Sequence, residues 1–177
     1  DYQAARVMND ILGGGGFSSR LVNRIRSDEG LAYSVGSRFD GGTYYKDPWR
    51  LAFQSKVRSV AYAIQIAMDE IKKMHDGAVT ADELELAKNK FIESFPSQFE
   101  TANAIATTLA MEEVTGRMQR DPNYFMEYRT RVKAVTADDV SRVAKRLLDP
   151  AHLTVLMVGN AKDILLGDPK HDAQIVA

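Results

Sequence analysis

The stretch that decides the fold reads GGGGFSSRLVNRIRSDEGLAYSV and runs from Gly13 to Val35. Four consecutive glycines stand before a basic, amphipathic segment, and this arrangement raises the question of a phosphate-binding turn. Glycine-rich turns that open helices bind phosphates because free backbone N–H groups and the helix dipole both favour an anion. The residues around the glycines decide between a nucleotide site and a turn that serves the fold.

The glycines match neither nucleotide-binding pattern. A P-loop needs a lysine and then Ser or Thr after its last glycine, but residues 17–20 here read FSSR. A dinucleotide fingerprint follows a strand, whereas a helical pattern precedes these glycines. We therefore interpret the run as a tight helix-to-helix connection, where glycine adopts backbone angles closed to other residues. The predicted structural loop comprises Gly13, Gly14, Gly15, Gly16, Ser18 and Ser19.

Helices are expected on both sides of this loop. Apolar residues recur at helical spacing from Ala5 to Leu12 and predict an opening helix that stops at Gly13. A second helix begins at Ser18 or Ser19, either of which can cap it, and ends near Gly30. Residues 31–39 and 50–57 then have the composition of strands, on either side of a turn-rich segment over 41–49.

The rest of the chain is mostly helical in pattern. A continuous apolar stripe from Val60 to Ile71 predicts a long helix that ends before Gly77. Capping boxes begin further helices at TADE (80–83) and TADD (136–139). Between them we expect helices over roughly 98–117 and 122–134, and after them a buried strand over 153–159.

This order predicts an α+β fold, with helices packed on one face of a mostly antiparallel sheet. Three strands make a thin sheet for so much helix, so we expect the first strands of the domain to come from before Asp1. The chain opens directly on a helical pattern, which suggests a piece of a longer polypeptide. We assign residues 1–160 to one domain and 161–177 to a tail.

Composition sets broad limits on the class of protein. The chain has 177 residues, 45% of them hydrophobic, with a formal net charge of −1 and no cysteine. No basic excess argues for nucleic acid, no apolar run approaches the roughly 18 residues of a membrane span, and disulfide and thiolate chemistry are excluded. The compartment stays open between bacterial periplasm and cytoplasm.

Metal and nucleophile chemistry find little support in the sequence. The three histidines, at 75, 152 and 171, are far apart, and none belongs to an H-x-x-E-H or H-E-x-x-H motif. A zinc site built by this chain alone is therefore not expected. Glu112 and Glu113 without histidines are typical of a solvated helix face. G-x-S-x-G is absent, so the serines at 18 and 19 are interpreted as caps and not as nucleophiles.

Arg26 and Tyr33 form the candidate binding pair. A guanidinium and a phenol that meet where a helix gives way to a strand can hold a peptide carbonyl or a carboxylate by charge-assisted hydrogen bonds. Taken alone, however, an arginine and a tyrosine seven residues apart more often form a surface ion pair and a half-buried ring. The pattern leaves both interpretations open.

Several motifs, in order, resemble the second domain of pitrilysin-type (insulinase-like, mitochondrial-processing-peptidase-like) zinc metallopeptidases. The glycine run continues into FSSRL and then GLAYSV, as in that family. AIQIAMDEIKKMHDGAVTADELELAKNKF over 63–91 and VTADDVSRVAKRLLDPAHLTVLMVG over 135–159 resemble its later segments. The likeness covers about residues 1–160. The family has three glycines where this chain has four.

The resemblance implies a zinc-free half of a two-domain peptidase with a mitochondrial-processing-peptidase-like fold. A partner domain or subunit would carry H-x-x-E-H and the zinc, and this half would clamp the peptide substrate without being proteolytic alone. The family's substrate-binding arginine and tyrosine fall on Arg26 and Tyr33. The alternative is a non-catalytic scaffold or core subunit of the same fold.

Overall fold

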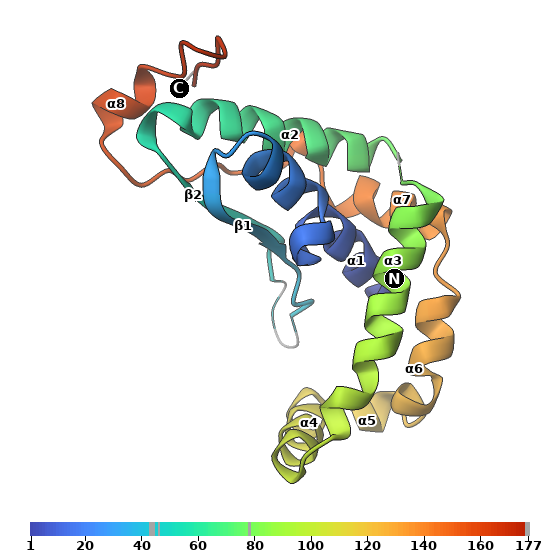
Figure 1. Cartoon of the computed structure of the whole chain (residues 1–177). Helices are drawn as coiled ribbons and strands as arrows, with labels where there is room; N and C mark the ends of the chain where they lie inside the picture. Colours follow the sequence, from blue (N-terminus) through green and yellow to red (C-terminus); the bar gives the residue numbers. More distant parts are fainter. Residues whose placement is uncertain (43–44, 46, 78, 176–177) are drawn as a thin grey trace.

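The computed structural model describes residues 1–42, 45, 47–77 and 79–175. Its larger elements are α1 (Tyr2–Asn9), β1 (Ala32–Arg38), β2 (Arg50–Ser55), α2 (Val60–His75), α3 (Ala81–Ser94), α4 (Ala102–Thr115), α5 (Arg117–Arg120), α6 (Tyr124–Lys133), α7 (Ala137–Leu147) and α8 (Ala161–Leu165). They form a body of α1, α2, α7 and the β1–β2 hairpin, from which α3 and α6 extend as an arm ending in α4 and α5 (Figure 1). The segment expected to be turn-rich includes residues 43, 44 and 46, which lie outside the described residues.

Three short helical pieces connect α1 to β1. They are the π-helical η1 (Asp10–Gly14), the 3-10 turn η2 (Gly16–Ser18) and the π-helical η3 (Val22–Asp28). The expectation that the first helix stops at Gly13 is wrong, because α1 continues directly into η1 and Gly13 is buried within it. A glycine can continue a helix where a side chain would collide with a neighbouring strand.

The sheet is a two-stranded antiparallel hairpin. Along β2 the side chains of Leu51, Phe53 and Ser55 are half-buried, while Ala52 and Gln54 are exposed. Leu51 and Phe53 pack against the buried helical core, so the helices cover one face of the hairpin. The α+β class is confirmed.

Residues 153–159 do not form the third strand that the sequence predicts. They have no regular structure, and Leu156 and Val158 are 86% and 94% exposed. A strand needs a neighbouring strand to hydrogen-bond its main-chain N–H and C=O groups. Among the described residues, no strand pairs with residues 153–159. The apolar pattern is real, but the pairing that would convert it into a buried strand is missing.

Both capping boxes are confirmed. The Thr80 hydroxyl accepts from the Glu83 main chain and the Glu83 side chain returns to the Thr80 main chain, at the start of α3. Thr136 and Asp139 do the same for α7. The helix expected over 98–117 is shorter: α4 ends at Thr115, and Gly116, with a φ of 63°, separates it from α5.

The core of the body lies between α1, α2 and α7. From α2 it takes a face that includes Ala63, Ala67 and Met74. Val60 and Ile64, placed in the apolar stripe by sequence, are only half-buried, so the buried face is rotated about the helix axis.

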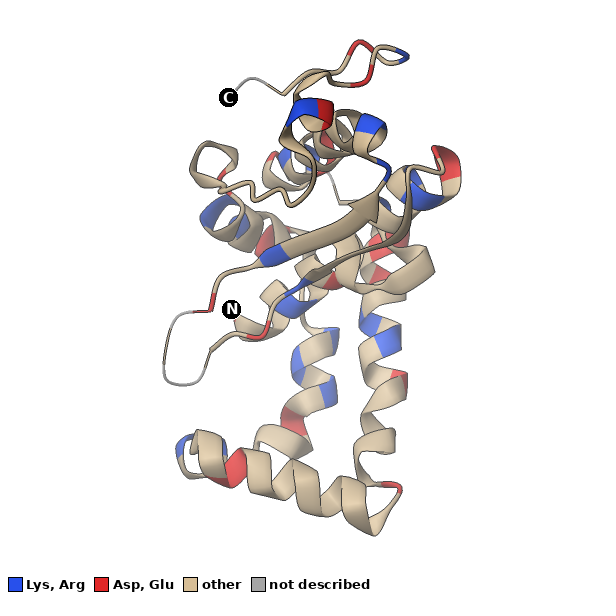
Figure 2. Ribbon diagram, turned by 90° about the vertical axis from the view of Figure 1, so that its left-hand side faces the viewer, with Lys and Arg blue, Asp and Glu red and all other residues tan. Residues whose placement is uncertain are grey.

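The arm has its own smaller core. Tyr124, Tyr128 and Val132 of α6 pack with Phe91 and Phe95 from α3 and the turn after it. Helix α4 at the end of the arm carries no Lys or Arg, and its acidic residues lie near its C-terminal end (Figure 2). Within the described part of the chain, no helix has the length and apolar character needed to cross a bilayer.

The C-terminal residues fold back onto the body. The ring of His171 stacks on Tyr62 of α2 with centroids 3.9 Å apart. Asp168 accepts from the His171 ring at 2.9 Å, and this hydrogen bond lowers the pKa of Asp168. The segment therefore packs on α2 through specific contacts.

Candidate functional site

The glycine loop is held against β1 at its first residue. A Cβ on Gly13 would lie 2.6 Å from Ser37 Oγ and 2.9 Å from the main-chain nitrogen of Ser37. Real Cβ atoms do not approach other atoms this closely, so only glycine fits. Gly16 has a φ of 67°, a left-handed conformation that favours glycine and turns the chain into Phe17.

Two serines brace the loop from inside. The Ser18 hydroxyl donates to the Gly15 carbonyl at 3.0 Å, and the buried Ser19 hydroxyl donates to the Gly16 carbonyl at 2.7 Å. The second helix starts directly after Ser19, as the sequence predicts, because Ser19 has an extended backbone and its carbonyl accepts from the Asn23 N–H at 3.0 Å. The expectation that a serine side chain caps this helix is nevertheless wrong, since the Ser19 hydroxyl bonds to Gly16 instead. Both hydroxyls act on the loop that precedes it, because each carbonyl three residues back is within reach.

The second helix ends where the sequence predicts. Gly30 has a φ of 61°, and the Leu31 N–H donates to the Ile25 carbonyl at 2.9 Å. A left-handed glycine with such a backward hydrogen bond is the usual helix C-terminal motif. It sends the chain directly from η3 into β1.

This turn brings Arg26 and Tyr33 together. The Arg26 guanidinium carbon lies over the Tyr33 ring, 5.2 Å from its centroid. The same carbon lies 4.6 Å from the centroid of the Phe17 ring. Arg26 is half-buried, whereas Tyr33 and Phe17 are 85% and 69% exposed. The three side chains form one exposed cluster, which we call the aromatic-arginine cluster.

A β-bulge exposes Tyr33. Ala32 pairs with Ser55 and Ser34 pairs with Gln54, so Tyr33 is an extra residue on β1 with no partner position on β2. A bulge redirects a side chain and interrupts the alternation of a strand. Accordingly, Tyr33 and Ser34 are both exposed.

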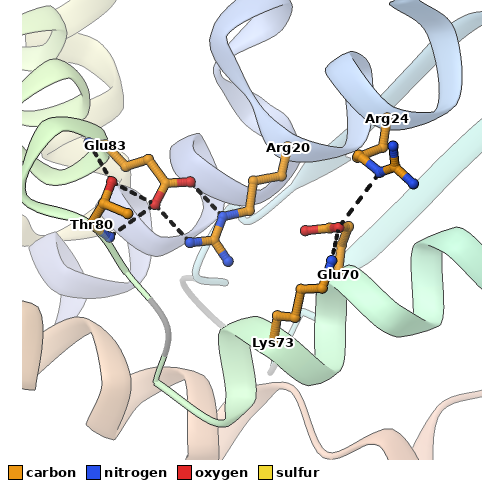
Figure 3. A network of polar contacts seen from close by, with 6 residues as sticks. All are labelled: Arg20, Arg24, Glu70, Lys73, Thr80 and Glu83. Carbon is orange, nitrogen blue, oxygen red and sulfur yellow. Dashed lines mark hydrogen bonds and ion pairs between the residues drawn. The ribbon is translucent and has the colours of Figure 1, made fainter. Parts of the chain in front are cut away.

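The other two arginines of the helix are used for structure. Arg20 forms a bidentate ion pair with Glu83, at 2.6 and 2.7 Å, and so ties the start of the second helix to α3 (Figure 3). Arg24 donates to Asp28 at 3.2 Å and lies 4.0 Å from the buried carboxylate of Glu70 on α2 (Figure 3). Glu70 also accepts from Lys73 at 2.7 Å. These ion pairs fix the helix from two sides.

Arg26 differs from both. Among the described residues, its guanidinium has no ion-pair or hydrogen-bond partner, and the aromatic rings that it contacts are those of Phe17 and Tyr33. Its N–H groups are consequently available to an acceptor from outside the chain. This is the feature that a binding arginine requires.

The Arg20–Glu83 pair makes stability depend on pH. Burial raises the pKa of Glu83, but hydrogen bonds from Arg20 and Thr80 outweigh burial and place the pKa below its ordinary value of 4.5. The ionised carboxylate therefore stabilises the folded chain fully above about pH 4.5. This contribution is lost as the pH falls through the lowered pKa.

We expect Glu83→Gln to lower the free energy of unfolding by about 1–3 kcal/mol at pH 7, through loss of charged hydrogen bonds and half of a capping box. Urea unfolding at pH 7, 5, 4 and 3 measures the effect, which should shrink below pH 4.5. Glu93→Gln, at an exposed position of the same helix, is the control and should change little. An undiminished difference at pH 3 would contradict the assignment.

The residues present do not fit a metal. Within the described ranges, no group of three or more His, Asp or Glu side chains is placed to hold an ion. His75, His152 and His171 each contact a different aspartate, at positions 76, 149 and 168. No step of a reaction is therefore assigned to a metal held by this chain.

A cleft of about 610 Å³ lies elsewhere on the described residues. It is lined by the start of α1 and by residues of α5 and α6, and contains none of the aromatic-arginine cluster. Two of its arginines are paired, Arg117 with Glu112 and Arg131 with Asp121. These ion pairs connect residues within the arm, so the two arginines are already occupied. The cleft is therefore not assigned as the site.

Sequence reasoning missed Phe17. Its only signal is its position, directly after the glycines and before two serines, where an apolar residue belongs to no helical or strand pattern. The structure shows that it packs in neither core cluster and contacts Arg26 instead.

Comparison with known proteins gives one family and several relatives. Residues 1–91 match the family model described as the peptidase M16 inactive domain. A Streptomyces coelicolor protein named an uncharacterized zinc protease is 29% identical over 162 residues, 90% of this chain and 34% of that protein. The non-peptidase homolog YmxG of Helicobacter pylori is 32% identical over 110 residues, 61% of this chain and 24% of that protein. The chain thus spans about a quarter to a third of the length of these relatives.

A solved structure supports the fold. The peptidase M16 inactive domain from Pseudomonas fluorescens aligns with a TM-score of 0.68 and 23% identity, over 85% of this chain and 35% of that one. At this identity the likeness concerns the fold alone.

Proposed function

Because the chain belongs to the peptidase M16 inactive-domain family, we propose that it is the zinc-free, substrate-clamping half of a two-domain zinc metallopeptidase. It is not proteolytic alone. Its partner is a homologous domain or subunit bearing H-x-x-E-H, which supplies zinc and the general base. The division of the chain into a domain over 1–160 and a tail over 161–177 belongs to the same proposal.

One observation carries the proposal: Arg26 contacts two aromatic rings, one of them the exposed phenol of Tyr33, and has no hydrogen-bond acceptor among the residues that the structure describes. A peptide offers carbonyl oxygens, which accept hydrogen bonds from both a guanidinium and a phenol. Charge-assisted hydrogen bonds of this kind are roughly twice as strong as neutral ones. The pair therefore suits a peptide main chain.

In the assembled enzyme, Arg26 and Tyr33 donate hydrogen bonds to the scissile carbonyl oxygen or to a carbonyl beside it. Donors aimed at the oxygen where negative charge develops lower the barrier more than they strengthen substrate binding. Arg20 and Arg24, through Glu83 and Glu70, keep the helix that carries Arg26 in place. The chain thus contributes positioning and electrostatic stabilisation.

A scaffold function is the second candidate. It is favoured by the 32% identity to YmxG, a protein named as a non-peptidase homolog. A scaffold subunit would have the same fold and would bind a homologous partner without cleaving peptides. Loss of activity on mutation of Arg26 or Tyr33 in an assembled enzyme distinguishes the two functions.

We expect Tyr33→Phe to lower kcat/KM of the assembled enzyme by about 5- to 50-fold, since it removes one hydrogen-bond donor and keeps the ring over Arg26. The measurement is cleavage of a quenched fluorogenic peptide, together with the zinc content of the complex. Zinc content should not change. Full activity of the variant would show that the phenol has no part in the reaction.

A further inference from the structure

Phe17 is a large apolar side chain without a place in the core. It is 69% exposed, and the one ring contact it makes among the described residues is with the Arg26 guanidinium, 4.6 Å from the ring centroid. A phenylalanine exposed in this turn buries little apolar surface and therefore does not stabilise the fold. Its contact with Arg26 is what explains its position.

The loop is built to hold Phe17 there. Gly16 turns the chain at a φ of 67°, and the Ser18 and Ser19 hydroxyls tie the turn on the other side of Phe17 back to glycine carbonyls. Gly13 fixes the loop to β1 by close approach. The backbone on both sides of Phe17 is thereby restrained, although its side chain is in solvent.

Two rings restrain Arg26 better than one. A free arginine side chain loses rotamer entropy when it is fixed in one conformation, and the attraction of a cation to one exposed ring offsets only part of that loss. Tyr33 alone therefore holds Arg26 incompletely. With the ring centroids of Phe17 at 4.6 Å and of Tyr33 at 5.2 Å, both rings restrain the guanidinium before substrate binds.

We propose that Phe17 is a positioning residue for Arg26. Phe17 holds the guanidinium over Tyr33, so that the Arg26 side chain is already restrained when its N–H groups bind a peptide carbonyl. This inference rests on the proposed function, since it acts through the arginine that the function assigns to substrate.

The first test needs no activity. In a ¹⁵N-edited NMR spectrum of this chain, stacking on Phe17 shifts the Arg26 Nε–H resonance by its ring current. Phe17→Leu should move that signal toward the position of free arginines, while Phe17→Tyr should retain the shift. An Arg26 signal that is identical in wild type and Phe17→Leu would overturn the contact.

The second test uses the assembled enzyme and the fluorogenic peptide. We expect Phe17→Leu and Phe17→Ala each to lower kcat/KM by about 3- to 10-fold, and Phe17→Tyr to recover most of that loss. In an Arg26→Ala background the Phe17→Leu change should have less than about a 2-fold effect, because its route to the substrate is gone. The control is Met126→Ala, because Met126 is also an exposed apolar residue but lies on α6, away from Arg26 in the sequence.

The outcomes separate the two proposals. A Phe17→Leu effect of equal size with and without Arg26 would mean that Phe17 acts independently of the arginine and would overturn its positioning role. The positioning role would also be overturned if Phe17→Leu loses the NMR shift but keeps the wild-type kcat/KM, while Arg26→Ala is impaired. If Arg26→Ala itself is fully active, the proposed function has failed, whatever the NMR result.

Discussion

Replacing Arg26 by alanine is expected to lower kcat/KM of the assembled peptidase by about 10²- to 10³-fold, the usual effect of removing a donor that stabilises a developing oxyanion. Among the three arginines of this helix, Arg26 is the one that forms no ion pair with a carboxylate of the described residues. Arg20 and Arg24 stay paired with Glu83 and Glu70, so the helix should keep its position. Zinc content should be unchanged, because no zinc ligand is altered.

Steady-state kinetics on a quenched fluorogenic peptide measure the effect. Arg129→Ala is the matched control, because Arg129 is exposed on α6 and also lies over an aromatic ring, that of Phe95. Arg26→Lys should recover only part of the activity, since an ammonium lacks the planar fork of donors. Wild-type kinetics for Arg26→Ala would show that the arginine does not contact substrate.

Replacing Gly13 by alanine is expected to lower the free energy of unfolding by about 1–3 kcal/mol, the cost of overpacking a buried site. The new Cβ would lie 2.6 Å from Ser37 Oγ, 2.8 Å from Leu21 Cδ1 and 2.9 Å from the main-chain nitrogen of Ser37. The side chains can rotate, but the nitrogen belongs to the β1 backbone. The loop and the strand must therefore move apart.

Urea unfolding of the two proteins measures this difference. Gly36→Ala on β1 is the control, because its Cβ would meet only the Gly13 carbonyl, at 3.4 Å, and alanine suits a strand at least as well as glycine. We expect its effect to stay below about 1 kcal/mol. An unchanged midpoint for Gly13→Ala would mean that the loop is not packed against β1 as the structure has it.

Local sequence signals predicted much of the fold. Thr80 and Thr136 begin helices through capping boxes whose partners stand at a fixed spacing, so both were predictable. Gly30 ends the second helix because a left-handed residue is needed there. The same helix–glycine–strand pattern predicted that Arg26 lies on a helix and Tyr33 on the strand that follows it.

Other features depend on contacts that sequence does not encode locally. The bulge at Tyr33 arises from pairing with β2, and the continuation of α1 through Gly13 arises from packing on Ser37. Residues 153–159 have a strand composition, yet a strand forms only beside another strand. Phe17 breaks every periodic pattern, so its contact with Arg26 emerges only in three dimensions.

The most direct test of the proposed function compares this chain alone, an H-x-x-E-H-bearing half alone, and the two together. That half would be encoded upstream in the same gene or by the neighbouring gene. The readout is cleavage of a quenched fluorogenic peptide, with and without a zinc chelator. We predict cleavage only by the joined halves, abolished by the chelator and restored by zinc. Cleavage by this chain alone would contradict the proposal, and so would a stable complex of both halves that leaves the peptide intact.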